Sequence, residues 1–424
     1  MKRKKIILLS IIAVLLLPFW MWMAWWLTPK RKLTVAIVDK TVLDRSGQEH
    51  ISFDWVLNQQ RFTKNRRALY SPDHDYFGFF PGSDDHYRIK GLERMGVDRL
   101  QQLASDADMA YFTDTYGVEF QKTASQGNVT RLPERSNVCP SDNEPPVRSD
   151  QEWYKKVPDN ERSEILYGGM SMQDIEFLKE MKARHKLMIA EFNAIGSPTQ
   201  ADVRHQFEDI FGLHWSGWTV RYFSSLDTAI NRELPHWLTG QYRQQHGGAW
   251  PFHKDGIVWV NNAGGIVILE NVTDLVSPLP EIAARQAGLQ DLDLPAFAKY
   301  PFWFDVIDED TARGEAGPNE VAAEFVIHAN ARGEDLLRQN HIPVRCPAVL
   351  RHKGPDYGFY YFSGDFCDNP LSFGTSYFKG IGWFKGLFYN DNDAGERKSF
   401  FWNFYRPMMT RILEDEYKHI SSGH

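Results

Sequence analysis

The chain has 424 residues, of which 14% are aromatic and 24% are charged, and its formal net charge at pH 7 is −7. That length is enough for a large hydrophobic core and for more than one domain. Because the chain is acidic and has no basic cluster beyond its first 32 residues, it lacks the charge that nucleic-acid binding requires, and we exclude that class of partner.

The chain begins with basic residues, which are followed by the uncharged apolar run Ile6 to Leu27. As a helix, this run would span roughly 33 Å at about 1.5 Å per residue, which is enough to cross a bilayer. Its four tryptophans gather at one end, as in the aromatic belt of a membrane helix. The alternative is a cleaved signal peptide, but the sequence around Trp26 lacks the small residues of a cleavage site. We therefore expect residues 1–32 to be an uncleaved membrane anchor, with residues 6–27 in the lipid bilayer.

The charges that flank this run predict its orientation. Four basic residues and the free amine precede it, and three basic residues follow it. The positive-inside rule then places the amino terminus in the cytoplasm. We expect a single-pass protein whose main domain is extracytoplasmic.

Residues 33–270 read as an α/β core. Leu33 to Val38 and Asp108 to Phe112 are short apolar runs that predict buried strands, and Asp39 and Asp114 lie at or just beyond their ends. Residues 121–163 are polar with few apolar positions, so we interpret them as an excursion from the core.

The clearest unit of this core runs from Glu164 to Phe211. A short strand at 165–167 ends in two glycines, and Ser171 with Asp174 then forms a variant of the capping box that opens a helix. Leu187 to Ala190 is the unbroken apolar sequence of a strand buried on both faces. Strands that alternate with capped helices predict a right-handed parallel crossover. The fold class we expect is α/β, with an open, mostly parallel sheet flanked by helices.

Residues 271–424 contain more strand candidates and many aromatic side chains. The runs at 302–307, 322–327 and 359–362 predict strands, and the chain ends in a helix. This β-rich half is either a continuation of the core or a second subdomain, and the sequence leaves both open.

The order of strand, Gly-Gly, helix and buried strand with a polar end resembles the class I glutamine amidotransferase-like superfamily. That group is flavodoxin-like and includes trehalose-utilisation-like proteins and the trimerisation domain of some β-galactosidases. Its catalytic members carry a cysteine in the turn G-x-C-x-G after a buried strand. Here that position falls in the segment Ala190 to Ala194, which has no cysteine and no flanking glycine. The resemblance therefore implies the architecture without the amidotransferase activity.

Polar side chains follow several predicted strands. In a parallel sheet these ends meet at one edge, where open α/β sheets bind ligands. Carboxylates and rings at such an edge suit a sugar, because its hydroxyls need acceptors and its faces stack on aromatic side chains. The alternative for each acid is a structural role in a cap or a loop. The candidate catalytic residues are Asp114 and Glu191, and the candidate substrate-binding residues are Asp39, Tyr116, Asn193, Trp215 and Trp218.

No motif in the sequence predicts a cofactor or a metal. The three cysteines have no CxxC spacing, and the run Asn390 to Gly395 lacks the glutamate that completes a calcium loop, because Phe401 stands at that position. We expect a membrane-anchored protein that binds or remodels carbohydrate of the cell envelope. The alternatives are a glycosidase-like hydrolase that uses the sheet-edge carboxylates, or a non-catalytic scaffold in a membrane complex. The sequence leaves the oligomeric state open.

Overall fold

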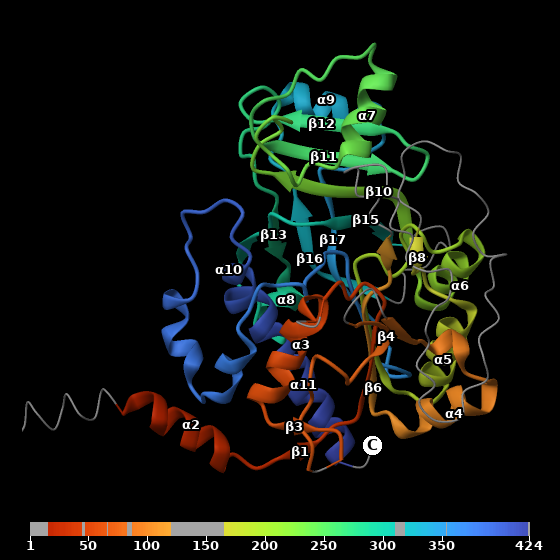
Figure 1. The fold of residues 1–424 in the computed structure, drawn as a ribbon, viewed down its shortest axis with the longest axis vertical. Helices are drawn as coiled ribbons and strands as arrows, with labels where there is room; N and C mark the ends of the chain where they lie inside the picture. Colours follow the sequence, from red (N-terminus) through yellow and green to blue (C-terminus); the bar gives the residue numbers. More distant parts are fainter. Residues whose placement is uncertain are drawn as a thin grey trace, which may run out of the picture.

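A computed structural model describes residues 16–44, 47–65, 67–82, 87–119, 165–309, 319–352 and 354–422. It contains a ten-stranded sheet with helices on both faces, and a four-stranded sheet at one end (Figure 1). Across the large sheet the strands lie in the order β14 (Phe297–Lys299), β13 (Glu281–Ala284), β16 (Asn319–Val326), β17 (Arg345–His352), β18 (Phe359–Phe362), β9 (Leu187–Glu191), β6 (Met109–Asp114), β2 (Val35–Asp39), β4 (Phe77–Pro81) and β5 (Tyr87–Lys90).

Five strands at the centre of this sheet are parallel: β18, β9, β6, β2 and β4. The chain first moves from β2 to β4, and it then returns to the other side of β2 to form β6, β9 and β18. The strand order therefore reverses between β2 and β6, where Asp39 is in register with Asp114. In open α/β sheets, ligands bind outside the carboxyl ends of the strands at such a reversal.

The flanking strands run antiparallel, so the expectation of a mostly parallel, flavodoxin-like sheet is wrong. β5 pairs antiparallel with β4, and β17 pairs antiparallel with β18. Their connections, at 82–86 and 353–358, are too short for the crossover that parallel neighbours need. β16, β13 and β14 continue the antiparallel arrangement to the far edge. The sheet is mixed.

The large sheet is covered on both faces (Figure 1). One face packs against α3 and α11 through residues such as Ile37, Phe53 and Met409. The other packs against α4, α5 and α6 through residues such as Phe112 and Phe177. Burial on both faces explains why the central strands are unbroken apolar runs, as Leu187 to Ala190 predicted. The helices are α2 (Leu17–Leu27), α3 (Gln48–Gln59), α4 (Val97–Asp106), α5 (Met172–Ala183), α6 (Ala201–Phe211), α7 (His236–Gln245), α8 (Gln286–Asp291), α9 (Ala331–Gln339), α10 (Lys398–Phe400) and α11 (Arg406–Ser421), with shorter turns η1 (Leu92–Arg94), η4 (Phe373–Tyr377), η5 (Ile381–Leu387) and η6 (Phe401–Tyr405).

Helix α5 begins as the sequence predicted, but the strand before it lies elsewhere. The Ser171 hydroxyl accepts from the Asp174 amide, and Asp174 Oδ2 accepts from the Ser171 amide at 2.7 Å, which completes a capping box. Strand β8 (Ile165–Tyr167) pairs antiparallel with β7 (Val118–Glu119), outside the large sheet. A Cβ atom on Gly168 would lie 2.1 Å from the Tyr116 carbonyl oxygen, so only glycine permits this close approach. The strands that flank α5 in the large sheet are therefore β6 and β9.

The second sheet contains β12 (Ile266–Glu270), β11 (Gly256–Asn261), β10 (Leu213–Phe223) and β15 (Phe304–Glu309), all antiparallel. It lies at the upper end of the molecule in Figure 1, next to α7 and α9. A two-stranded parallel pair, β1 (Arg31–Lys32) with β3 (Phe62–Thr63), follows α2. The polar excursion expected at 121–163 lies outside the described residues, as do residues 6–15.

The expected transmembrane anchor is not supported. Among the described residues, no helix is long and apolar enough to cross a membrane. Helix α2 has 11 residues, and its Trp25 is docked on the protein: the indole donates to the Asn58 carbonyl at 3.0 Å and packs edge-on against Tyr377. The single-pass localisation, with a cytoplasmic amino terminus and an extracytoplasmic main domain, rested on that anchor and is withdrawn with it.

Candidate functional site

Six carboxyl groups gather at the carboxyl ends of the parallel strands. Asp39, Asp114 and Glu191 are the last residues of β2, β6 and β9, and Asp365 follows β18. Two more come from the first turn of α3 and from the loop after β18. The electrostatic interactions among these groups place them in mutual proximity. We call this set the carboxylate cluster; it comprises Asp39, Glu49, Asp114, Glu191, Asp365 and Asp368.

Asp39 is held by a buried histidine. His50 Nδ1 lies 2.5 Å from Asp39 Oδ2, and His50 Nε2 lies 2.7 Å from the Pro72 carbonyl oxygen. Both ring nitrogens face acceptors, so the ring satisfies them fully only as the doubly protonated imidazolium. Burial acts to lower the pKa of His50, but Asp39, Asp54 and the Pro72 carbonyl outweigh it and raise the pKa to about 9. Asp39 therefore faces a cation, and its other oxygen accepts from the Thr41 amide at 3.0 Å.

Burial opposes the ionisation of four other members of the cluster. Burial, followed by the charge of Asp39, raises the pKa of Asp114 well above its usual range. Burial also raises the pKa of Glu191 and of Asp365 well above theirs, with Asp365 adding to the effect on Glu191 and Asp368 to the effect on Asp365. Burial and Asp39 raise the pKa of Glu49 to about 8. These environments favour the protonated forms of the four groups, and a protonated carboxyl group can donate a hydrogen bond.

Few cations compensate the cluster. Besides His50, Arg397 reaches it, with Nη2 3.2 Å from Asp368 Oδ2. Lys40 follows Asp39 in the sequence, but its ammonium is committed to Asp174 at 2.6 Å and to Glu93 at 3.5 Å. Glu191 is fully buried; one oxygen accepts from the Phe366 amide at 3.2 Å, and Oε1 has no hydrogen-bond partner among the described residues. Asp39 and Asp368 therefore face cations, whereas the other four carboxyl groups of the cluster have no ion-pair partner among the described residues.

The cluster is nearly closed. Asp365 and Arg397 line a crevice with Phe302 and Phe400, and in the described part of the chain this crevice has no free volume for a water-sized molecule. The Arg397 guanidinium carbon lies 3.3 Å from the centroid of the Phe302 ring. Within the described ranges, no group of three or more histidine, cysteine or acidic side chains has the arrangement of a metal site.

Besides Asp39, two of the substrate-binding candidates lie at the same edge. Asn193 adopts a left-handed backbone conformation with φ 61°, and its amide donates to Asp305 Oδ2 at 3.2 Å. This bond links the segment after β9 to β15 of the second sheet, where Asp305 Oδ1 accepts from the Thr219 hydroxyl at 2.7 Å. Tyr116 is half-buried beside Asp114, whose Oδ1 accepts from the Tyr116 amide at 2.6 Å.

The two tryptophans lie in the core instead. Trp215 is 5% exposed and Trp218 is 8% exposed. The Trp215 indole donates to the Trp218 carbonyl at 3.2 Å, and the Arg204 guanidinium covers its ring at 5.2 Å. Neither ring offers an open face on which a sugar could stack.

Sequence reasoning missed Glu49, His50, Asp368 and Arg397 as members or partners of the cluster. A signal existed for the first two, because the start of a helix that follows a parallel strand lies at the carboxyl edge of the sheet. No local pattern marks Arg397, which reaches the cluster only through the tertiary fold.

Comparisons with known proteins show only a distant likeness. No family model matches the chain, and no curated protein matches it. Similar solved structures include a ThuA-like protein from Bacteroides uniformis (8% identity, TM-score 0.31, 80% of this chain and 83% of that chain) and one from Parabacteroides merdae (10%, 0.32, 79% and 79%). A third is a β-galactosidase from Bacillus circulans sp. alkalophilus (11%, 0.31), of which this chain spans 30% while 81% of this chain is covered. Likeness at this level suggests the amidotransferase-like architecture only weakly, and no functional argument rests on it. The class that the fold and the site define is an α/β protein with a mixed sheet and a carboxylate cluster at a strand-order reversal.

Proposed function

We propose that the carboxylate cluster binds a polyhydroxylated ligand of the carbohydrate class. The observation that carries this proposal is the convergence of six carboxyl groups, from four strand ends and two flanking segments, at the place where the strand order reverses. Structural ion pairs would bring a cation for each acid. Here only His50 and Arg397 reach the cluster among the described residues.

The protonation states suit hydroxyl groups. A sugar hydroxyl both donates and accepts, so it pairs best with a site that offers both roles. Asp39 faces the imidazolium of His50 and acts as an acceptor. Burial raises the pKa values of Asp114 and Glu191, which favours their protonated forms, and these can act as donors. The Phe302 ring, beside Asp365 at the crevice, supplies apolar surface for the face of a sugar ring.

Entry of a ligand requires the crevice to widen. Asp365 and Arg397, from the segment after β18, form one wall of the crevice. Phe302 forms the opposite wall. Separation of Arg397 from the Phe302 ring would expose Asp365 first and Glu191 behind it. We assign this movement to ligand binding.

A hydrolase is the second candidate, and one observation favours it. Glycoside hydrolysis uses one protonated and one ionised carboxyl group on either side of the scissile bond. Asp114, whose pKa burial raises, is in register with Asp39, which is paired with His50. Environments that keep one acid protonated beside an ionised neighbour are typical of such pairs. In this version Asp114 or Glu191 is the general acid.

The test is binding of the full chain to a glycan array, followed by titration calorimetry with the best ligand. We expect at least one glycan to be retained, and we expect Asp114→Asn and Glu191→Gln to weaken it tenfold or more. The matched control is Asp335→Asn, which removes an exposed acid outside the cluster. Retention of no glycan by the wild-type chain, or unchanged binding by both variants, would refute the proposal. Turnover of nitrophenyl glycosides by the wild type, and not by Glu191→Gln, would select the hydrolase.

A further inference from the structure

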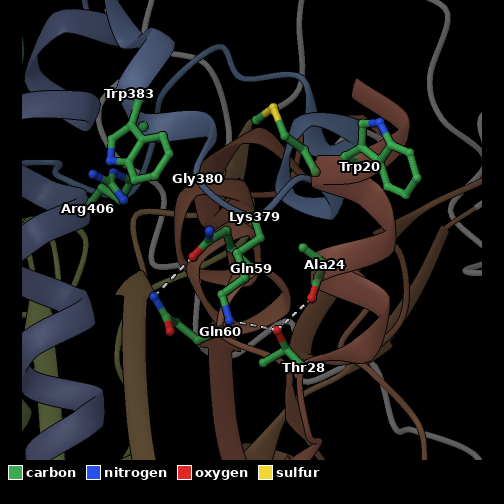
Figure 2. A pocket seen from close by; sticks show the side chains of 11 residues that line it. Trp20, Ala24, Thr28, Gln59, Gln60, Lys379, Gly380, Trp383 and Arg406 are labelled. Carbon is green, nitrogen blue, oxygen red and sulfur yellow. Dashed lines mark hydrogen bonds between the residues drawn. The ribbon is translucent and has the colours of Figure 1, made fainter. Parts of the chain in front are cut away.

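A second site, which shares no residue with the carboxylate cluster, lies beside helix α2. A groove of about 660 Å³ runs between α2 and the end of α3 on one side, and η5 and the start of α11 on the other (Figure 2). This volume is in the range of small-molecule sites, roughly 300–1,000 Å³. Figure 2 shows Trp20 and Trp383 on opposite sides of the groove.

The walls of the groove are apolar and exposed. Trp383 is 90% exposed and Trp20 is 48% exposed, and Met21 and Ala24 continue the α2 wall. On the same two elements, Trp26 of α2 and Leu387 of η5 also present much of their surface to solvent. Contiguous apolar surface of this kind marks a binding site more often than scattered single residues do.

The groove also holds an unneutralised cation. Arg406 lines it, and no carboxylate of the described residues lies within ion-pair distance of its guanidinium. Its Nε is buried and has no hydrogen-bond partner in the described part of the chain. Burial alone lowers the pKa of Arg406, with no acid to oppose that effect. The guanidinium carbon lies 5.5 Å from the centroid of the Trp402 ring.

The backbone is shaped around this guanidinium. A Cβ atom on Gly382 would lie 2.8 Å from Arg406 Nη2, so the absence of a side chain leaves room for Arg406 at the groove wall. Lys379 is the second cation of the groove; its ammonium donates to the Thr28 hydroxyl at 3.0 Å and has no acidic partner among the described residues. No acidic residue lines the groove in the described chain.

We propose that this groove binds an amphipathic anion, a long-chain carboxylate of the fatty-acid class. The apolar tail lies between Trp20, Met21 and Trp383, and the carboxylate accepts hydrogen bonds from Arg406 and Lys379. The charge complementarity selects this occupant, because an uncharged or cationic amphiphile would leave Arg406 without a partner. The site is independent of the carboxylate cluster and of the function proposed for it.

The test uses the full chain and three probes with twelve-carbon chains (in dodecanoate the carboxylate carbon included), below their micellar concentrations: dodecanoate, dodecyl maltoside and dodecyltrimethylammonium. Affinities are measured by titration calorimetry. We expect dodecanoate to bind at least tenfold more tightly than the other two, and Arg406→Gln to weaken dodecanoate by about ten- to a hundredfold. The matched control is Arg411→Gln on the same helix, which removes a cation paired with Asp415 and outside the groove lining; it should leave the affinity unchanged.

A second readout locates the probe without depending on Arg406. A fatty acid brominated at the end of its chain quenches nearby indoles, so it should quench the wild-type fluorescence and quench Trp383→Phe less. Equal affinity for the three probes, an unchanged affinity in Arg406→Gln, or quenching that does not depend on Trp383 would each overturn the proposal. Binding to anionic vesicles without binding of monomeric dodecanoate would also overturn it.

Discussion

Replacement of His50 by glutamine tests the electrostatic account of the cluster. His50 is fully buried, and each of its ring nitrogens has one acceptor, the Asp39 carboxylate at 2.5 Å and the Pro72 carbonyl at 2.7 Å. Its pKa rises from 6.5 to about 9 in the folded protein. At roughly 1.4 kcal/mol for each pH unit, that difference corresponds to about 3 kcal/mol of stability from the charged ring.

The direction of the pH dependence of this stability contribution follows from the linkage between proton binding and folding. Because the folded-state pKa lies above the unfolded-state value, this contribution is fully present below about pH 6.5 and is lost as the pH rises through about 9. In His50→Gln the contribution is absent at every pH, and Asp39 loses its cation. We expect the variant to be less stable than wild type by about 3 kcal/mol or more at pH 6, and the gap to narrow by about that amount at pH 9.5.

The assay is urea unfolding, followed by tryptophan fluorescence, at pH 6, 7.5 and 9.5. His74→Gln is the control, because it removes a histidine whose side chain is 60% exposed, and it should keep the wild-type pH profile. Two buried acids also titrate in this range, Asp54 with a pKa of about 7 and Glu49 with a pKa of about 8, so the diagnostic interval lies above pH 8. If the difference in unfolding free energy between His50→Gln and wild type is the same at all three pH values, the reasoning is wrong.

Three further changes have defined outcomes. Burial raises the pKa of Asp54 to about 7, so the stability of the wild type falls as the pH rises from 4 through 7. In the same urea assay, the free energy of unfolding of Asp54→Asn should exceed that of the wild type by up to about 4 kcal/mol at pH 8 and should equal it at pH 4. Burial raises the pKa of Glu191, so Glu191→Gln should change the free energy of unfolding at pH 7 by less than about 1 kcal/mol, and a larger loss would contradict a protonated Glu191. Ser171→Ala removes the capping box of α5 and should cost about 1 kcal/mol by thermal unfolding, whereas Ser171→Asp should restore most of it.

Short-range signals in the sequence predicted several elements correctly. The Ser171 and Asp174 pair marks the start of α5, because a capping box needs only four consecutive residues. Leu187 to Ala190 predicts a strand buried on both faces, and β9 is such a strand. The acids at the ends of the predicted strands do meet at one edge, because the strands that carry Asp39, Asp114 and Glu191 are neighbours and parallel.

Strand pairing could not be predicted in the same way, because it depends on contacts between distant segments. Ile165 to Tyr167 forms a strand as predicted, but it pairs with β7 outside the large sheet. β5 and β17 run antiparallel to their neighbours because short connections join them to β4 and β18. The sequence does not show which strands these connections pair. Hydropathy alone predicted a membrane helix over residues 6–27, whereas the described helix α2 begins at Leu17 and is docked through Trp25. Aromatic content likewise suggested a sugar platform at Trp215 and Trp218, which the structure places in the core.

The members of the carboxylate cluster come from widely separated parts of the chain, and this has a consequence for folding. Asp39 and Asp365 are more than 300 residues apart, and their strands are separated in the sheet only by those of Asp114 and Glu191. Contacts at such separation form late, because long loops must close first. Asp365 and Asp368 therefore join the other acids of the cluster only when the last parallel strand is in place, and a bound ligand would stabilise that final step. A chain cut before β18 would hold three of the strand-end acids and the Phe302 wall of the crevice, but neither Asp365 nor Arg397.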